Sequence, residues 1–142
     1  MEKKHCKGFD LGPGPVIIHM PYQSYKNKNY RTAVWTGDNL QMTLMNIGRD
    51  GEIGVEMHDD VDQLIRIECG SAKVFMGSCR KDMKFVSNVS CGDAILVPAG
   101  TWHNIVNASC RELKLSSVYA PPQHPFGTVH ETKEDSDKEH HY

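Results

Sequence analysis

Residues 92–107 have the sequence GDAILVPAGTWHNIVN, and this stretch decides the fold of the chain. The apolar run at 94–97 has the length of a buried strand. Pro98 and Gly100 end that run, because proline lacks a ladder donor and glycine permits a tight turn. His103 then begins a second apolar stretch. Histidine is a common metal ligand, so His103 is a candidate ligand at the start of a strand.

The chain on either side continues as short apolar segments separated by turn residues. Such a succession, without helical periodicity, indicates a β-sandwich or β-barrel. We expect strands at residues 31–35, 40–47, 53–58, 63–69, 72–76, 84–86, 94–97, 103–106 and 112–119.

A chain of 142 residues fits a single domain. Residues 1–30 are rich in lysine, glycine, proline and asparagine, so we expect an N-terminal arm without a helix. Residues 31–120 form the predicted barrel domain, and residues 121–142 form a proline-rich segment and a charged tail.

The C-terminal segment also contains a helix signal. Thr128 followed by Glu131 fits a capping box, which predicts a short helix that begins at Val129.

Composition argues against several classes of partner. The chain has 16 Lys plus Arg against 18 Asp plus Glu, and this net charge of −2 predicts no binding to nucleic acid or to membrane. No apolar stretch follows the lysines near the N-terminus, so we expect no signal peptide and a cytoplasmic location. The five cysteines have no C-x-x-C spacing and are expected to be free thiols.

The spacing around His103 resembles the second signature motif of the cupin superfamily. The matching positions are Gly92, Pro98, Gly100, His103 and Asn107. The resemblance implies a jelly-roll barrel of two packed antiparallel sheets. It also implies that His103 is a metal ligand.

Residues 51–70, GEIGVEMHDDVDQLIRIECG, resemble the first cupin motif. In the family, two histidines one residue apart precede a glutamate, and a glycine follows. Counting back from Gly70 places Gln63 at the glutamate position. His58 then occupies the second histidine position and Glu56 the first. Two of these three ligand positions therefore carry a residue type that differs from that of the family: Glu56 in place of histidine and Gln63 in place of glutamate.

Strand geometry supports the same register without reference to the family. Side chains alternate along a strand, so Glu56 and His58 project from one face. Gln63 shares a face with Ile65 and is predicted to point inward. The predicted metal site is Glu56, His58, Gln63 and His103. Two imidazoles and one carboxylate suit iron, manganese, nickel or zinc better than calcium or magnesium.

The same residues favour a metal-dependent enzyme. A divalent ion with one carboxylate keeps about one positive charge, which attracts an anionic oxygen ligand and acidifies a bound water. The expected substrate is small and rich in oxygen, such as a phosphosugar or an oxo acid, in a reaction of isomerase or oxygenase type. No general acid or base can be assigned.

Within the superfamily, residues 34–47 and 119–133 resemble small bacterial single-domain cupins described as mannose-6-phosphate isomerase-like. Two other functions stay open. Many cupin barrels hold sugars or water without a metal, so the chain also fits a non-catalytic module for a sugar or another small molecule. It fits, thirdly, an assembly domain in which the polar cluster is vestigial.

Assembly is predicted from the outward face of the first motif. Ile53, Val55 and Met57 alternate with the inward ligands, so an apolar row is expected to face outward and to need cover by another subunit or by the N-terminal arm. Cupins commonly pair sheet to sheet, and the resemblance therefore implies a homodimer.

Overall fold

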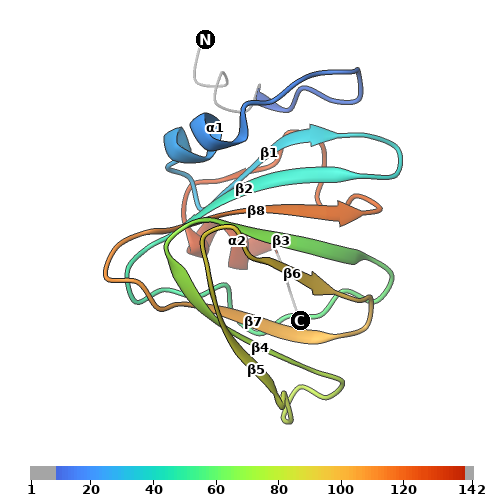
Figure 1. Cartoon of the computed structure of the whole chain (residues 1–142). Coiled ribbons are helices and arrows are strands. Elements are labelled where there is room, and N and C mark those ends of the chain that lie inside the picture. The colour runs from blue at the N-terminus through green and yellow to red at the C-terminus, as the bar shows by residue number, and fades with distance from the viewer. Residues whose placement is uncertain (1–8, 140–142) are drawn as a thin grey trace.

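The computed structural model describes residues 9–139, which form two antiparallel sheets and two short helices (Figure 1). The larger sheet has the order β6-β3-β8-β2-β1-β9 and consists of β1 (Arg31–Thr36), β2 (Gln41–Ile47), β3 (Asp62–Cys69), β6 (Ala94–Val97), β8 (Leu113–Ala120) and β9 (Val129–His130). The smaller sheet has the order β5-β4-β7 and consists of β4 (Ser71–Gly77), β5 (Phe85–Ser90) and β7 (Trp102–Asn107). The helices are α1 (Met20–Lys26) and α2 (Lys133–Glu139).

The hydrophobic core lies between the two sheets. In β3 the buried side chains of Ile65 and Ile67 alternate with exposed ones, as expected of a strand with one buried face. Ile105 of β7 and Leu113 and Leu115 of β8 are equally inaccessible to solvent. Each such side chain stabilises the fold by roughly 1.5–3 kcal/mol. The predicted jelly roll of two packed antiparallel sheets is confirmed.

One end of the barrel interior is polar, and the strand register explains its position. Gln41 of β2, Tyr119 of β8 and Gln63 of β3 lie directly opposite one another. Thr43 of β2 lies opposite Ser117 of β8 on the same face. All five side chains are buried. Buried polar groups need hydrogen-bond partners, so this end of the interior is suited to polar ligands.

The segment expected as a strand at 53–58 is not one. It pairs with β7 through isolated bridges, at Glu52 and at Glu56. Between them Gly54 has a φ of +100°, and its N–H donates to the side chain of Asn104 (2.9 Å) instead of to a backbone carbonyl. A φ in this range interrupts the pleat, so side chains do not alternate regularly through the segment.

The predicted outward row of Ile53, Val55 and Met57 is therefore wrong. Ile53 is buried in the core of the same chain, where its carbonyl accepts a hydrogen bond from the Tyr30 hydroxyl (3.3 Å). Val55 and Met57 are half-buried. Ile53 is therefore covered by its own domain and needs no partner surface.

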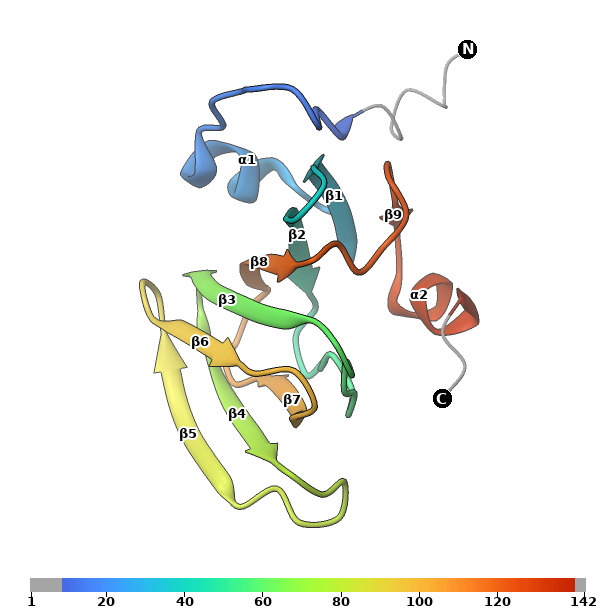
Figure 2. The same cartoon turned by 90° about the vertical axis from the view of Figure 1, so that its right-hand side faces the viewer.

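The N-terminal segment contains α1, so the expectation of an arm without a helix is wrong there. Pro21 lies in the first turn, where its missing N–H costs no intrahelical bond. The segment lies beside β1 and β2 (Figure 2). Thr32 and Leu44 of these strands line a hollow together with Ile17 of the segment. Packing of this kind stabilises a helix even where the local sequence signal for one is weak.

The C-terminal helix begins at Lys133, later than the expected start at Val129. The Thr128 hydroxyl donates to a backbone carbonyl, and Val129–His130 form β9, which pairs with β1. The capping box lies between Thr132 and Asp135, whose backbone N–H groups donate to each other's side chains (3.3 and 3.2 Å).

Neither helix in residues 9–139 has the length and apolar composition needed to cross a bilayer. The cysteines in this part of the chain are free, as predicted, at positions Cys69, Cys79, Cys91 and Cys110. Cys6 lies outside the described residues.

Candidate metal centre

Backbone pairing brings Glu56 and His103 to the same place. The Glu56 N–H donates to the His103 carbonyl (3.0 Å), and the His103 N–H donates to the Glu56 carbonyl (2.9 Å). Residues paired in this way project their side chains to one face. His58 is held by a hydrogen bond from the Gly100 N–H to its carbonyl (2.7 Å). The turn that ends β6 therefore helps to position the ligand-bearing segment.

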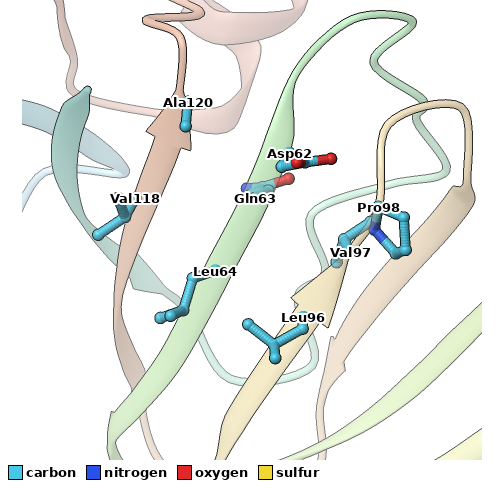
Figure 3. A pocket seen from close by; sticks show the side chains of 8 residues that line it. All are labelled: Asp62, Gln63, Leu64, Leu96, Val97, Pro98, Val118 and Ala120. Atoms are coloured by element: carbon cyan, nitrogen blue, oxygen red, sulfur yellow. The ribbon is translucent and has the colours of Figure 1, made fainter. Parts of the chain in front are cut away.

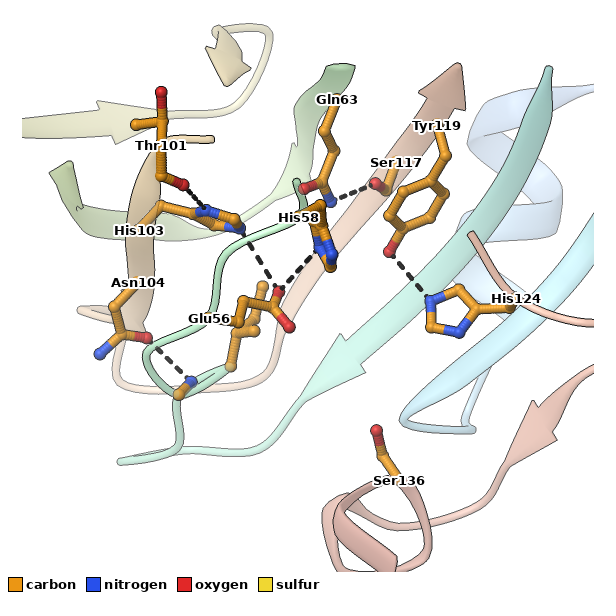
Figure 4. Close-up of polar contacts among 12 residues, drawn as sticks. Glu56, His58, Gln63, Thr101, His103, Asn104, Ser117, Tyr119, His124 and Ser136 are labelled. Carbon is orange, nitrogen blue, oxygen red and sulfur yellow. Dashed lines mark hydrogen bonds and ion pairs between the residues drawn. The ribbon is translucent and has the colours of Figure 1, made fainter. Parts of the chain in front are cut away.

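The three side chains converge on one point (Figure 4). Glu56 Oε2 lies 3.4 Å from His103 Nε2 and 3.9 Å from His58 Nε2. One ligand atom from each residue lies within 4.8 Å of the others. Donor atoms around an ion at about 2.1 Å are roughly 3–4 Å apart, so these separations suit one shared cation.

The hydrogen bonding of His103 leaves the correct nitrogen for a metal. Nδ1 lies 3.0 Å from the Thr101 carbonyl, which can only accept, so Nδ1 carries the proton. Nε2 of the neutral ring is then an acceptor directed at Glu56. Within residues 9–139 it has no hydrogen-bond partner, and Glu56 Oε2 lies 3.4 Å away. Metal-binding histidines are typically oriented through the other ring nitrogen in this manner.

Gln63 of β3 contributes a second buried acceptor atom, its amide oxygen Oε1. Its Nε2 donates to the Ser117 hydroxyl (2.8 Å), which fixes the orientation of the amide. Its Oε1 is buried and has no hydrogen-bond partner among residues 9–139. In Figure 4 the amide nitrogen points toward Ser117 and the amide oxygen points away from it. An unpartnered buried amide oxygen costs about 1–3 kcal/mol, and a cation or a bound water would satisfy it.

The Glu56 carboxyl stays ionised. Burial raises its pKa, but the interactions with His103 and His58 and the charge of Arg31 outweigh burial and hold the pKa below its ordinary value. The centre therefore presents one carboxylate at neutral pH. A carboxylate, two imidazoles and an amide oxygen fit a divalent transition metal.

A row of rings leads from the centre across the interior. The ring centroids of His103 and His58 are 5.6 Å apart, and those of His58 and Tyr119 are 6.0 Å apart. Beyond Tyr119 the row continues to His124 (5.1 Å) and then to His130 (6.2 Å). The Tyr119 hydroxyl lies 3.4 Å from His124 Nε2. The row ends at His130, whose Nε2 lies 2.9 Å from Glu139 Oε1 of α2.

Sequence reasoning missed Arg31, which lies at the far end of this row. Its Nη1 is 3.0 Å from His130 Nδ1 and donates to the Ser136 hydroxyl of α2 (2.8 Å). Arg31 lies opposite Met45 on β2, so it points into the barrel. One indication was present in the sequence: Arg31 lies two residues before Ala33 in a predicted strand, so the two side chains share a face of β1.

Comparison with known proteins gives two relatives of high identity. YrkC of Bacillus subtilis, an uncharacterized protein, is 50% identical over 127 residues, which cover 89% of this chain and 68% of YrkC. The crystal structure of BH2720 from Bacillus halodurans superposes with a TM-score of 0.91 at 47% identity, and the match covers 92% of this chain and 98% of BH2720. No model of a known protein family matches the sequence.

A more distant structure has the same fold. An RmlC-like cupin from Shewanella frigidimarina superposes with a TM-score of 0.56 at 18% identity, over 66% of this chain and 77% of that protein.

Proposed function

The chain belongs to the same family as YrkC and BH2720 and has the cupin fold, and on this basis we propose that it is a metal-dependent enzyme. The proposed ligands are Glu56, His58, Gln63 and His103, and the proposed ion is manganese, iron, nickel or zinc. The substrate would be small and rich in oxygen.

One observation carries the proposal. His103 Nε2 and Gln63 Oε1 are buried without hydrogen-bond partners in residues 9–139, and His103 Nε2 lies 3.4 Å from a carboxylate oxygen of the ionised Glu56. The lone pair of a neutral imidazole and a carboxylate oxygen repel each other unless a cation lies between them. A divalent ion would remove that repulsion and satisfy the orphaned atoms together.

The chemistry follows from the donor set. When bound, the ion would polarise a substrate carbonyl or acidify a water. Glu56 neutralises one of its two positive charges. The Thr101 carbonyl keeps the His103 ring in the metal-binding tautomer, and Ser117 holds the Gln63 amide with its oxygen toward the centre. These two groups reduce the reorganisation needed for binding.

Elemental analysis tests the proposal. Protein produced without an affinity tag would be stripped with a chelator, dialysed against manganese, iron, nickel or zinc in turn, and measured by plasma mass spectrometry. We expect about one ion per chain with at least one of these metals. Stripped protein that retains none of the four after dialysis would refute the metal centre.

The reaction type rests on the donor set and on the resemblance to mannose-6-phosphate isomerase-like cupins. An isomerase would use the polarised carbonyl during proton transfer, whereas an oxygenase would need iron. Turnover of phosphosugars and of oxo acids by each metal-loaded form distinguishes these versions. A non-catalytic sugar-binding module is the alternative, and it predicts binding of the same compounds without turnover in any form.

We also propose a homodimer, although its surface is not the row first expected. Leu96 is 64% exposed and Leu64 is 38% exposed, and with Val118 they line a hollow of about 320 Å³ on the outward side of β3, β6 and β8 (Figure 3). Exposed apolar side chains that adjoin one another favour a partner surface. Light scattering during size exclusion should give twice the chain mass, and Leu96→Asp should give the monomer mass.

The free thiols at Cys69, Cys79, Cys91 and Cys110 support a cytoplasmic location, where thiols stay reduced. Fractionation of the producing cell would test it.

A further inference from the structure

A small cavity adjoins the candidate metal centre on the side of α2. Its volume is about 250 Å³, and it is lined by residues of β1, of the segment around Gly54 and of α2. Glu56 lines it and also belongs to the metal centre. Arg31, Tyr30 and Lys133 line it as well. A ligand in this cavity would therefore lie beside both Glu56 and Arg31.

Arg31 is a buried cation that has no ion pair among the residues that the structure describes. Its side chain donates to neutral acceptors: the Ser136 hydroxyl (2.8 Å), a ring nitrogen of His130 (3.0 Å) and the sulfur of Met45 (4.0 Å). Among residues 9–139 no carboxylate lies within 4.0 Å of the guanidinium, and its Nε is buried without a hydrogen-bond partner. The residue as a whole is 3% exposed.

The guanidinium nevertheless stays charged. Burial lowers its pKa, but the neighbouring hydroxyls of Tyr119 and Tyr30 and the Glu56 carboxylate raise the pKa above its ordinary value. A buried charge without a counter-ion costs several kcal/mol, and an anion bound in the cavity would recover that cost. The planar fork of arginine suits an oxyanion with two coplanar oxygens.

The charge balance favours a single negative charge at this end. Lys133 is the second cation of the cavity, but its Nζ lies 3.0 Å from Asp137 Oδ2, so that pair contributes no net charge. Glu56, the other carboxylate of the cavity, is taken up by the metal ion in the proposed function, so Arg31 is left to be neutralised. A carboxylate carries one charge at neutral pH, whereas a phosphate monoester carries nearly two.

We propose that Arg31 binds the carboxylate of the substrate and that the substrate is a small carboxylic acid with a second oxygen group directed to the metal centre. This inference rests on the proposed function, because the second group needs the metal. His130 and Ser136 are positioning residues, since they hold the guanidinium. His130 accepts from Arg31 through Nδ1, and its Nε2 then donates to Glu139 Oε1 (2.9 Å), which fixes the ring.

The test compares two probes that differ at one end only. Malonate has two carboxylates, and malonamate replaces one of them by a neutral amide of equal size. Calorimetry on nickel-loaded protein should give a malonate Kd about 10- to 100-fold lower than the malonamate Kd, the usual range for a hydrogen-bonded charge pair. In Arg31→Met the two Kd values should become equal. Arg66→Met removes an arginine that is half exposed and paired with Glu68, and it should keep the preference.

Two outcomes would overturn the inference: equal affinity of the two probes for the unmodified protein, which requires no variant, or an unchanged preference in a folded Arg31→Met. The proposed function fails separately. If no metal is retained but malonate is preferred through Arg31, the metal centre is refuted and the carboxylate site stands. If metal is retained and the preference is absent, the carboxylate site alone is refuted.

Discussion

Replacing His103 by leucine should separate metal binding from folding. Leucine has a volume close to that of imidazole, so the substitution leaves little cavity in a fully buried position. It removes the hydrogen bond from Nδ1 to the Thr101 carbonyl, which contributes about 1 kcal/mol. It also removes the buried Nε2, whose missing hydrogen bond costs roughly 1–3 kcal/mol in the unmodified protein. Loss of the hydrogen bond to Thr101 destabilises the variant, whereas removal of the unpartnered Nε2 stabilises it, so the two effects oppose each other.

The chelated His103→Leu protein should therefore unfold within about 2 kcal/mol of the chelated unmodified protein. The metal-loaded forms should differ more. Free metal at about 100 times Kd stabilises a folded protein by about 2.7 kcal/mol, which raises the Tm of a domain of this size by about 10 °C. His103→Leu should lose that increase.

The assay is thermal unfolding followed by circular dichroism, with and without metal, combined with metal content by mass spectrometry. His19→Leu is the matched control, because His19 precedes α1 and makes no side-chain cap. It should keep the full increase. A His103→Leu protein that still binds one ion per chain and gains about 10 °C on loading would refute the assignment of His103.

Three further predictions concern the surroundings of the centre. Ser117→Ala should weaken metal binding about 10- to 100-fold without changing the fold, because it frees the Gln63 amide; titration against a competing chelator measures the affinity. The pKa of Glu56 is held below its ordinary value of 4.5, because His103, His58 and Arg31 outweigh the opposing effect of burial. The ionised Glu56 therefore stabilises the chelated protein above pH 4.5, and this stabilisation is lost as the pH falls through the lower pKa of the folded state. Tm against pH should show this acid loss in the unmodified protein and a smaller one in Glu56→Gln. Gly54→Ala should destabilise the protein by about 1–3 kcal/mol in urea unfolding, because alanine resists a φ of +100°; an unchanged midpoint would contradict that account.

The ligands could be predicted from the sequence because their arrangement is set over short distances. Glu56 and His58 are two residues apart, and His103 follows a turn whose proline and glycine are visible in the chain. The outward side of the same segment was mispredicted because alternation fails at Gly54. Gly54 has a positive φ there, and its N–H donates to the Asn104 side chain, 50 positions away in the chain.

Longer distances explain the other errors. The contacts of Arg31 with His130 and Ser136 span 99 and 105 positions, so no local pattern marks Arg31 as a pocket residue. Two capping signals with the same spacing occur at Thr128 and Thr132. Pairing of β9 with β1 decided between them, and that pairing depends on the whole sheet.

The irregular attachment of residues 52–58 has a consequence for protein engineering. Glu56 and His58 are presented by a segment that belongs to neither sheet, and backbone hydrogen bonds hold it against β7 and the turn after β6. Backbone contacts do not depend on side-chain identity, so these two ligand positions can be exchanged while the barrel stays intact. His103 and Gln63 lie within strands of the two sheets. The scaffold therefore presents two ligands on strands and two on an irregular segment, and Glu56→His would convert the carboxylate-containing set into one with three imidazoles and a different preference among metals.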